Sequence, residues 1–92
     1  MNSRKEFYKI EKVLKGVANH RRIEMLELIV KDSGLSGEDI AEKLNVNYQT
    51  GSSHLRKLVR AELVSAYREG QSLAHDPSPL GLKVITFLKK LK

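Results

Sequence analysis

The sequence predicts a mainly α-helical fold with one small β-hairpin (class α+β), and two observations carry this prediction. Apolar residues recur at three- and four-residue steps through most of the chain, which is the spacing of amphipathic helices. After Leu63 the period changes, and VSAYREGQSLAH contains two short, partly alternating runs on either side of Gly70, as in a hairpin. Residues 1–92 contain no internal repeat, linker or low-complexity tract, so we expect a single domain.

Four helices are expected before the hairpin. Residues 3–17 carry an apolar stripe at helical spacing and form the first. The second follows Asn19, a residue type that caps helix N-termini well, and the third begins at Ser36, where Ser-x-x-Asp resembles a capping box. The fourth runs from the turn at 45–47 to about Ala61. The third and fourth helices are therefore separated by a tight turn.

The chain beyond the fourth helix predicts the hairpin at 63–76 and a last helix at 78–92. Ser78 suits the N-cap of that helix, and Pro79 is pre-organised for its first position. Pro77 cannot donate a backbone hydrogen bond, so we expect it to cut the second strand short. This order of elements is characteristic of a winged helix-turn-helix, in which the second helix of the pair enters the DNA major groove.

The front of the fourth helix has an unusual composition for a helix, because QTGSS is made of short polar residues and a glycine. Short side chains let a helix N-terminus approach base edges, and Gln49 can pair with adenine through two hydrogen bonds. For Gly51 itself we favour close packing against Ala41. Cations follow behind the polar front, where phosphates would run. The predicted DNA contacts are Ser36, Asn47, Tyr48, Gln49, Thr50, Ser52, Ser53, Arg56, Lys57 and Arg60, with Arg68, Gln71 and Ser72 on the wing.

The composition agrees with an anionic partner and excludes several other classes. The formal net charge is +6 and the pI is about 9.7, which suits nucleic acid, although many small basic proteins are basic only for solubility. The absence of cysteine excludes disulfides and thiolate metal sites and favours the cytoplasm. No apolar run approaches the roughly 20 residues of a membrane span, and the charged N-terminal segment has no apolar core of a signal peptide.

Several motifs resemble those of ArsR-type regulators across nearly the whole chain. LKGVANHRRIEMLELI is similar to the family's opening, EDIAEKLNVNYQTGSSHLRKLVRAELV to its helix-turn-helix, and REGQSLAH and SPLG to its wing and the exit from it. The resemblance implies a homodimeric, DNA-binding transcriptional regulator whose first and last helices build the dimer interface. The chain departs from the family pattern at His20, where Pro is frequent, at Gly51, where Val or Ile is usual, and at Glu62, where Gly is usual.

The first and last helices also carry apolar stripes wider than one partner helix would cover, as expected for a two-fold interface. Segments 1–17 and 78–92 are therefore the predicted dimerisation helices. A two-fold dimer places its recognition helices in successive major grooves about 34 Å apart, which predicts an inverted-repeat operator. The predicted interface residues are Phe7, Tyr8, Ile10, Leu14, Val84, Ile85, Phe87, Leu88 and Leu91.

Metal binding and catalysis are not expected. Many ArsR relatives sense metals through Cys-x-Cys on the first helix of the pair, and the matching positions here are Ser36 and Glu38. Others use Asp and His on the last helix, but LGLKVITFLKKLK contains neither. His20, His54 and His75 are dispersed, without the i,i+4 spacing of a metal-binding helix. No cofactor is predicted, and no paired nucleophile and base or glycine-rich phosphate loop suggests an enzyme.

The predicted function is sequence-specific binding of double-stranded DNA by a homodimeric repressor that occludes a promoter. The main alternative is a winged-helix module for protein–protein interaction that binds no specific DNA. The basic face that follows the polar helix front favours DNA, because an adaptor does not require it. Binding of single-stranded RNA is disfavoured, since Tyr48 and Tyr67 alone make no aromatic platform. The sequence does not exclude transcriptional activation, and it does not identify the operator or the signal that releases the protein from DNA.

Overall fold

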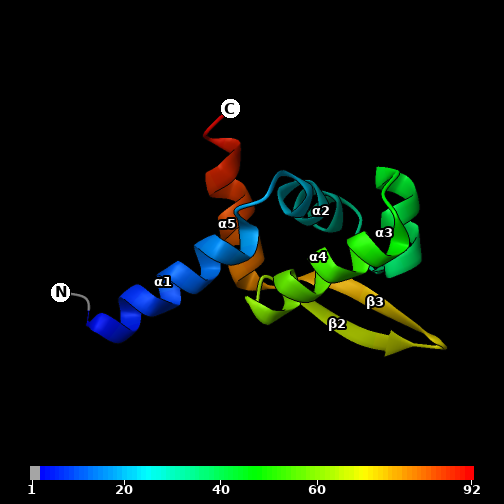
Figure 1. Cartoon of the computed structure of the whole chain (residues 1–92), viewed down its shortest axis with the longest axis horizontal. Coiled ribbons are helices and arrows are strands. Elements are labelled where there is room, and N and C mark those ends of the chain that lie inside the picture. Colours follow the sequence, from blue (N-terminus) through cyan, green and yellow to red (C-terminus); the bar gives the residue numbers. More distant parts are fainter. Residues whose placement is uncertain (1–2) are drawn as a thin grey trace.

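The computed structural model describes residues 3–92, so the first two residues of the predicted 1–17 segment lie outside it. Four helices precede a β-hairpin and a fifth helix, which confirms the predicted winged helix-turn-helix order (Figure 1). The elements are α1 (Arg4–Val17), α2 (His20–Lys31), β1 (Leu35–Ser36), α3 (Gly37–Leu44), α4 (Tyr48–Arg60), β2 (Val64–Glu69), β3 (Ser72–Pro77) and α5 (Pro79–Lys89).

The helices begin where their capping residues predicted. Ser3 forms a capping box at α1, and the Asn19 side chain accepts hydrogen bonds from two backbone N–H groups at the start of α2. At α3 the Ser36 hydroxyl accepts from the Asp39 N–H at 3.1 Å, and Ser78 caps α5. Each cap satisfies N–H groups that have no partner inside the helix, which fixes the first turn.

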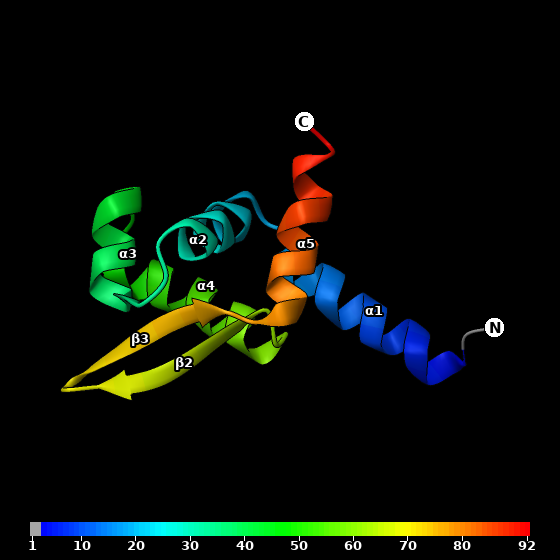
Figure 2. The same cartoon turned by 180° about the vertical axis from the view of Figure 1, so that it is seen from behind.

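The core forms where α2 meets the helix-turn-helix, the sheet and α5. Figures 1 and 2 show α2 behind α4 and beside α3, with α5 at its other end. Burial removes this apolar surface from water and is the main stabilising contribution to the fold. The largest fully buried side chains are Met25, Leu26, Ile29, Ile40, Leu58 and Leu63.

The sheet has three antiparallel strands in the order β1-β3-β2, one more than the predicted hairpin. β1 pairs Leu35 with His75 and Ser36 with Ala74. Two residues are too few to show a strand period in the sequence, and Ser36 already served as a helix cap. The second strand ends at Pro77, where the sequence placed its end, although Pro77 itself still belongs to β3 and lies opposite Val64.

Gly51 lies at the crossing of α3 and α4, as the packing interpretation predicted. It is buried, and a Cβ atom placed there would lie 3.5 Å from the Ala41 Cβ and 3.3 Å from the Val46 Cγ2. A Cβ atom would fit there only with a small shift of the Val46 methyl group, so there is little room for a larger side chain. This close packing accounts for one weak helix former in the front of α4.

Glu62 adopts the left-handed backbone conformation, with φ at 64°, directly after α4. A non-glycine residue in this region costs roughly 1–2 kcal/mol. We therefore expect Glu62→Gly to raise the free energy of unfolding by about 0.5–1 kcal/mol in urea titrations, once the greater freedom of glycine in the unfolded chain is included. Glu62→Ala should give no such gain, and a glycine variant less stable than the wild type would contradict this explanation.

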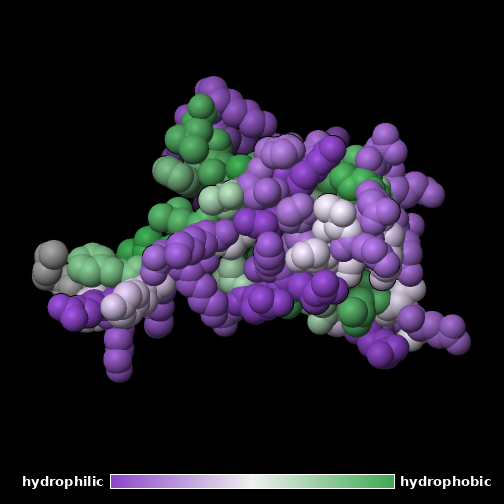
Figure 3. All heavy atoms as spheres, in the orientation of Figure 1, coloured by the Kyte–Doolittle hydropathy of each residue, from purple (hydrophilic) through white to green (hydrophobic). Residues whose placement is uncertain are grey.

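Two helices extend from the core and remain apolar on their outer sides. α1 projects away from the rest of the chain, on the side opposite the hairpin tip (Figures 1 and 2). Figure 3 shows apolar surface on α1 and at the end of α5. Their large exposed apolar residues are Phe7, Tyr8, Ile10 and Leu14 on α1, with Leu82 and Phe87 on α5 and Leu91 just beyond it.

Candidate nucleic-acid interface

The turn between α3 and α4 sets the direction of α4. Asn45 adopts the left-handed conformation at the end of α3, which reverses the chain within a few residues. The Asn47 side-chain oxygen then accepts from the N–H groups of Gln49 at 2.8 Å and Thr50 at 3.3 Å. Asn47 is thus an N-cap whose side chain holds the first turn of α4 in place.

The face of α4 opposite its buried leucines is polar and then basic. Leu55 and Leu58 point into the core, Gln49 and Thr50 are exposed, and Ser52 and Ser53 are half-buried. Three exposed cations follow, namely Arg56, Lys57 and Arg60. The helix therefore presents short polar groups at its N-terminus and positive charge towards its C-terminus.

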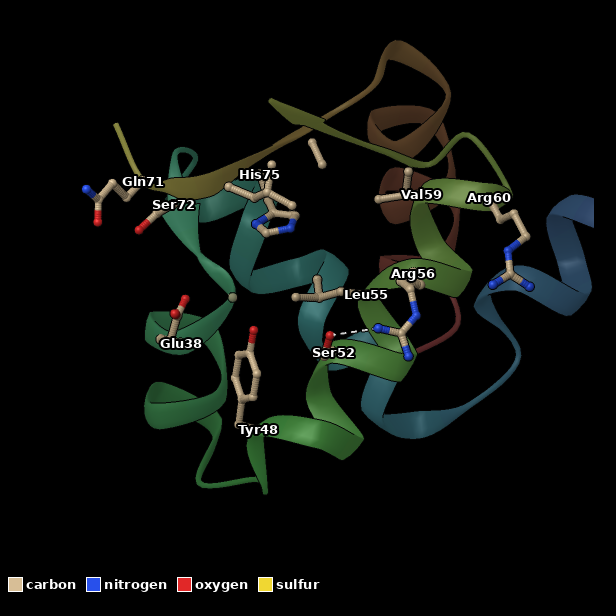
Figure 4. A pocket seen from close by; sticks show the side chains of 13 residues that line it. Glu38, Tyr48, Ser52, Leu55, Arg56, Val59, Arg60, Gln71, Ser72 and His75 are labelled. Atoms are coloured by element: carbon tan, nitrogen blue, oxygen red, sulfur yellow. Dashed lines mark hydrogen bonds between the residues drawn. The ribbon is translucent and has the colours of Figure 1, made fainter. Parts of the chain in front are cut away.

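The wing lies beside α4 and forms a groove with it. The exposed side chains of Gln71 and Ser72 come from the hairpin, and Ser52, Arg56 and Arg60 come from α4, around a groove of about 540 Å³ (Figure 4). Ser52 accepts a hydrogen bond at 3.0 Å from Arg56 Nη1, which holds that guanidinium along the helix. The fold thus brings predicted DNA contacts from α4 and from the wing around one groove. Arg68 is exposed near the hairpin tip.

Ser36 has several carboxylates around it, and it lines the same depression as the predicted wing contact Ser72. It is half-buried, and its hydroxyl already accepts the Asp39 N–H at the start of α3. It lines a second, shallow depression together with Glu38, Asp39 and Glu69. These carboxylates would repel a phosphate, so Ser36 is the least favoured of the predicted contacts on electrostatic grounds.

The positive surface extends further than the sequence indicated. Lys12 and Lys15 of α1 lie with Lys57 and Arg60 around a shallow depression at the end of α4. Lys15 Nζ is 3.3 Å from the Glu11 carboxylate, an exposed pair. No sequence pattern indicates this proximity, because α1 and α4 are far apart along the chain.

Arg22 links α1, α2 and α4 and was also missed. It is only 8% exposed and donates hydrogen bonds to the carbonyl oxygens of Gly16 at 2.7 Å and Lys15 at 3.2 Å. These carbonyls belong to the last turn of α1, where a cation is favoured. A guanidinium can only donate, so His54 Nδ1, 3.2 Å from Arg22 Nη1, accepts and carries no proton.

His54 makes the stability of the fold depend on pH. Burial and then the Arg22 guanidinium, with smaller effects of Lys57, His20 and Arg21, lower the pKa of His54 below 6.5. The unfolded chain binds this proton more readily, so the contribution of His54 is complete above pH 6.5 and is lost as the pH falls through the lower folded pKa. We expect the urea midpoint of the wild type to fall more between about pH 7.5 and 5.5 than that of His54→Gln. An equal fall of the urea midpoint in the wild type and in His54→Gln would contradict this role of His54.

The part of the chain that the structure describes contains neither a membrane-spanning helix nor a cluster of metal-ligating side chains. Within residues 3–92, no helix is long and apolar enough to cross a membrane. In the same range, no group of three or more His, Cys, Asp or Glu side chains is placed to hold a metal ion.

Comparison with known proteins identifies the family. Residues 19–65 match the family described as winged helix-turn-helix DNA-binding. The chain is 34% identical over 64 residues to the transcriptional repressor SdpR of Bacillus subtilis, covering 70% of each protein. The chain belongs to the ArsR family of winged helix-turn-helix transcriptional regulators. This ArsR-family protein is thus a DNA-binding transcriptional regulator rather than an enzyme.

Solved structures of other regulators share the fold of this ArsR-family chain. HlyU from Vibrio cholerae superposes with a TM-score of 0.84 at 29% identity, covering 97% of both chains. The homodimeric winged helix-turn-helix domain of Mb0332 from Mycobacterium bovis, a possible ArsR-family regulator, gives a TM-score of 0.86 at 26% identity, covering 99% of this chain and 86% of that one. NolR from Sinorhizobium fredii gives 0.85 at 25% identity, covering 99% and 94%.

The structure resolves two of the departures from the ArsR pattern. Glu62 keeps the left-handed backbone that the family's usual glycine would adopt without strain. Gly51 replaces a larger apolar residue where α3 and α4 are in close contact.

Proposed function

We propose that this chain is a homodimeric repressor that binds an inverted-repeat operator and excludes RNA polymerase from the promoter. The observation that carries the proposal is the surface of α4, where a front of short polar side chains is followed by exposed cations next to the wing. We place this activity in the cytoplasm, the compartment favoured by the cysteine-free sequence.

The proposed division of labour follows position along α4. Gln49, Thr50 and Ser53 read base edges in the major groove, where amide and hydroxyl groups can donate and accept. Lys57 and Arg60 neutralise phosphates, joined by Lys12 from α1. Arg68 at the wing contacts the backbone or the minor groove.

Dimerisation is supported by the apolar surfaces of α1 and α5. Phe87 is 55% exposed and Leu14 is 54% exposed, and they belong to a set of large exposed apolar residues on α1 and α5 of the kind that marks an interaction surface. The Mycobacterium bovis relative described above is homodimeric. One predicted interface residue needs correction: Ile85 is 4% exposed and belongs to the core of its own chain, so it is not available to a partner.

Repression is supported by the relative SdpR, which is named a transcriptional repressor. A dimer that spans two successive major grooves covers about 20 base pairs or more of a promoter, since each turn is about 10–10.5 base pairs. A dimer bound over this length of promoter DNA blocks RNA polymerase by steric exclusion and requires no further domain.

Substitutions on α4 should separate base reading from phosphate binding. Gln49→Ala combined with Ser53→Ala should reduce the preference for the operator over scrambled DNA, because each lost bidentate contact is worth about 1–3 kcal/mol of discrimination. The salt dependence of binding should change little. Arg60→Ala should instead weaken binding to every sequence and reduce the salt slope by about 1.

The readout is fluorescence anisotropy with operator and scrambled duplexes at several salt concentrations. Lys43→Ala is the matched control for Arg60→Ala, because Lys43 is an exposed cation on α3 outside the proposed contacts. An unchanged operator preference in the Gln49 and Ser53 double variant would show that the reading face is wrongly placed.

The proposed function is tested first with duplex DNA from the protein's own upstream region. We expect salt-sensitive binding that prefers the native duplex over a scrambled one. Absence of binding to either duplex at low salt would overturn the proposal and direct the search to protein partners of α4.

A further inference from the structure

The groove between α4 and the wing has the size and lining of a ligand site. Its volume of about 540 Å³ falls in the usual range for small-molecule pockets, about 300–1,000 Å³. Leu55, Val59, Ala66 and Leu73 form its apolar walls. Polar and charged side chains from α3, α4 and the wing surround these walls (Figure 4), and His75, Ser52 and Arg56 are among them.

One wall of this groove holds a buried histidine with a free nitrogen. His75 is only 5% exposed, and its ring points from β3 into the groove above Leu55 (Figure 4). Its Nδ1 lies 3.0 Å from the Leu35 carbonyl oxygen, so Nδ1 carries a proton and donates it. Among residues 3–92, the other nitrogen, Nε2, has no hydrogen-bond partner. Because Nδ1 donates to Leu35, Nε2 is the ring nitrogen that is left to accept a hydrogen bond from a bound molecule.

The charges around the groove favour one orientation of a bound molecule. Arg56 donates one N–H to Ser52, and its remaining donors have no partner among residues 3–92, so they are open to an anion. Glu38 lies at the opposite end, beside Tyr48, and would repel an anion there (Figure 4). A ligand with an acidic group at Arg56, a flat apolar body against Leu55 and Val59, and an N–H or O–H group at His75 satisfies all of these features.

We propose that this groove binds a small planar amphipathic anion, and that the bound ligand excludes DNA from α4. The exclusion of DNA rests on the function proposed above. It follows because the groove and the predicted DNA surface share Ser52, Arg56, Gln71 and Ser72. A molecule held between α4 and the wing would occupy Arg56 and keep the duplex from closing onto the helix. Such a ligand would release a repressor without any metal site.

The probe for this site is 8-anilinonaphthalene-1-sulfonate, which combines a sulfonate, a flat apolar ring system and one N–H donor. We expect its fluorescence to rise on binding, and the backbone amide NMR signals of residues 52–59 and 72–75 to shift together and saturate. Arg56→Ala should weaken binding about tenfold, because it removes a charge-assisted hydrogen bond. Lys43→Ala, which makes the same change of charge on α3 outside the groove, should stay within about twofold.

Three results would overturn the ligand site: NMR shifts confined to α1 and α5, no saturable shifts in the groove, or equal weakening of probe binding by Arg56→Ala and Lys43→Ala.

A second experiment tests whether the ligand and DNA exclude each other. Adding operator duplex to the wild-type protein should displace the probe, and a probe that stays bound to the DNA complex would overturn this exclusion. If the groove binds the probe but no duplex binds, the ligand site stands and the proposed function fails. If duplex binds while the groove amides do not respond, the proposed function stands and the ligand site fails.

Discussion

Gly81→Ala is expected to lower the free energy of unfolding by about 2–3 kcal/mol, and the melting temperature by roughly 10–20 °C. Gly81 lies in the first turn of α5, directly against the backbone carbonyl of Leu63, and a Cβ atom there would overlap that oxygen. The same oxygen accepts the Ser78 N–H at 3.0 Å, so it cannot move without breaking that bond. A backbone collision of this kind outweighs the roughly 1 kcal/mol that alanine gains over glycine inside a helix.

Gly51→Ala is the matched control for this prediction. Gly51 is also a buried helical glycine, but the nearest atom to its added Cβ would be the Val46 Cγ2 at 3.3 Å, a methyl group that can shift. We expect the helix propensity and the tighter packing to offset each other, which leaves stability within about 1 kcal/mol of the wild type. Urea and thermal unfolding measure both variants, and a Gly81→Ala protein of unchanged stability would contradict the packing of α5 against Leu63.

Phe87→Asp is expected to separate the proposed dimer and weaken binding to a two-site operator by about 100-fold or more. Phe87 is half-exposed on α5, so the substitution leaves the core of one chain intact while placing a charge in the proposed interface. Two linked recognition helices bind with an avidity that can exceed one site by about 10²–10⁴-fold, and this advantage is lost in a monomer. Leu14→Asp on α1 should act in the same way.

Sedimentation equilibrium measures the oligomeric state, and anisotropy with one-site and two-site duplexes measures the avidity. Ser33→Asp is the control, because it adds the same charge at an exposed position in the turn after α2, away from both helices. Circular dichroism verifies that each variant is folded. A Phe87→Asp protein that remains dimeric would place the interface elsewhere, and a monomeric wild type would remove the dimer from the proposal.

Much of the local structure could be read from the sequence. Asn19, Ser36 and Ser78 marked helix starts, because short polar side chains that cap free N–H groups act within three residues. The tight turn and the polar, then basic, composition of α4 identified the helix-turn-helix and its candidate surface. The wide apolar stripes and the family resemblance together led to the prediction that α1 and α5 dimerise, which stays a prediction.

The remaining features depended on residues that meet only in three dimensions. β1 exists because β3 lies beside Leu35, and two residues cannot show a strand period. Ile85 looked like part of an interface stripe, since periodicity gives the apolar side of a helix but not what covers it. Arg22 with His54, and Lys12 with Arg60, join helices distant in sequence. The sequence by itself determined the local elements and the chemistry of each surface, whereas packing decided which side chains are buried and which charges meet, because burial and Coulomb interactions depend on distance in space.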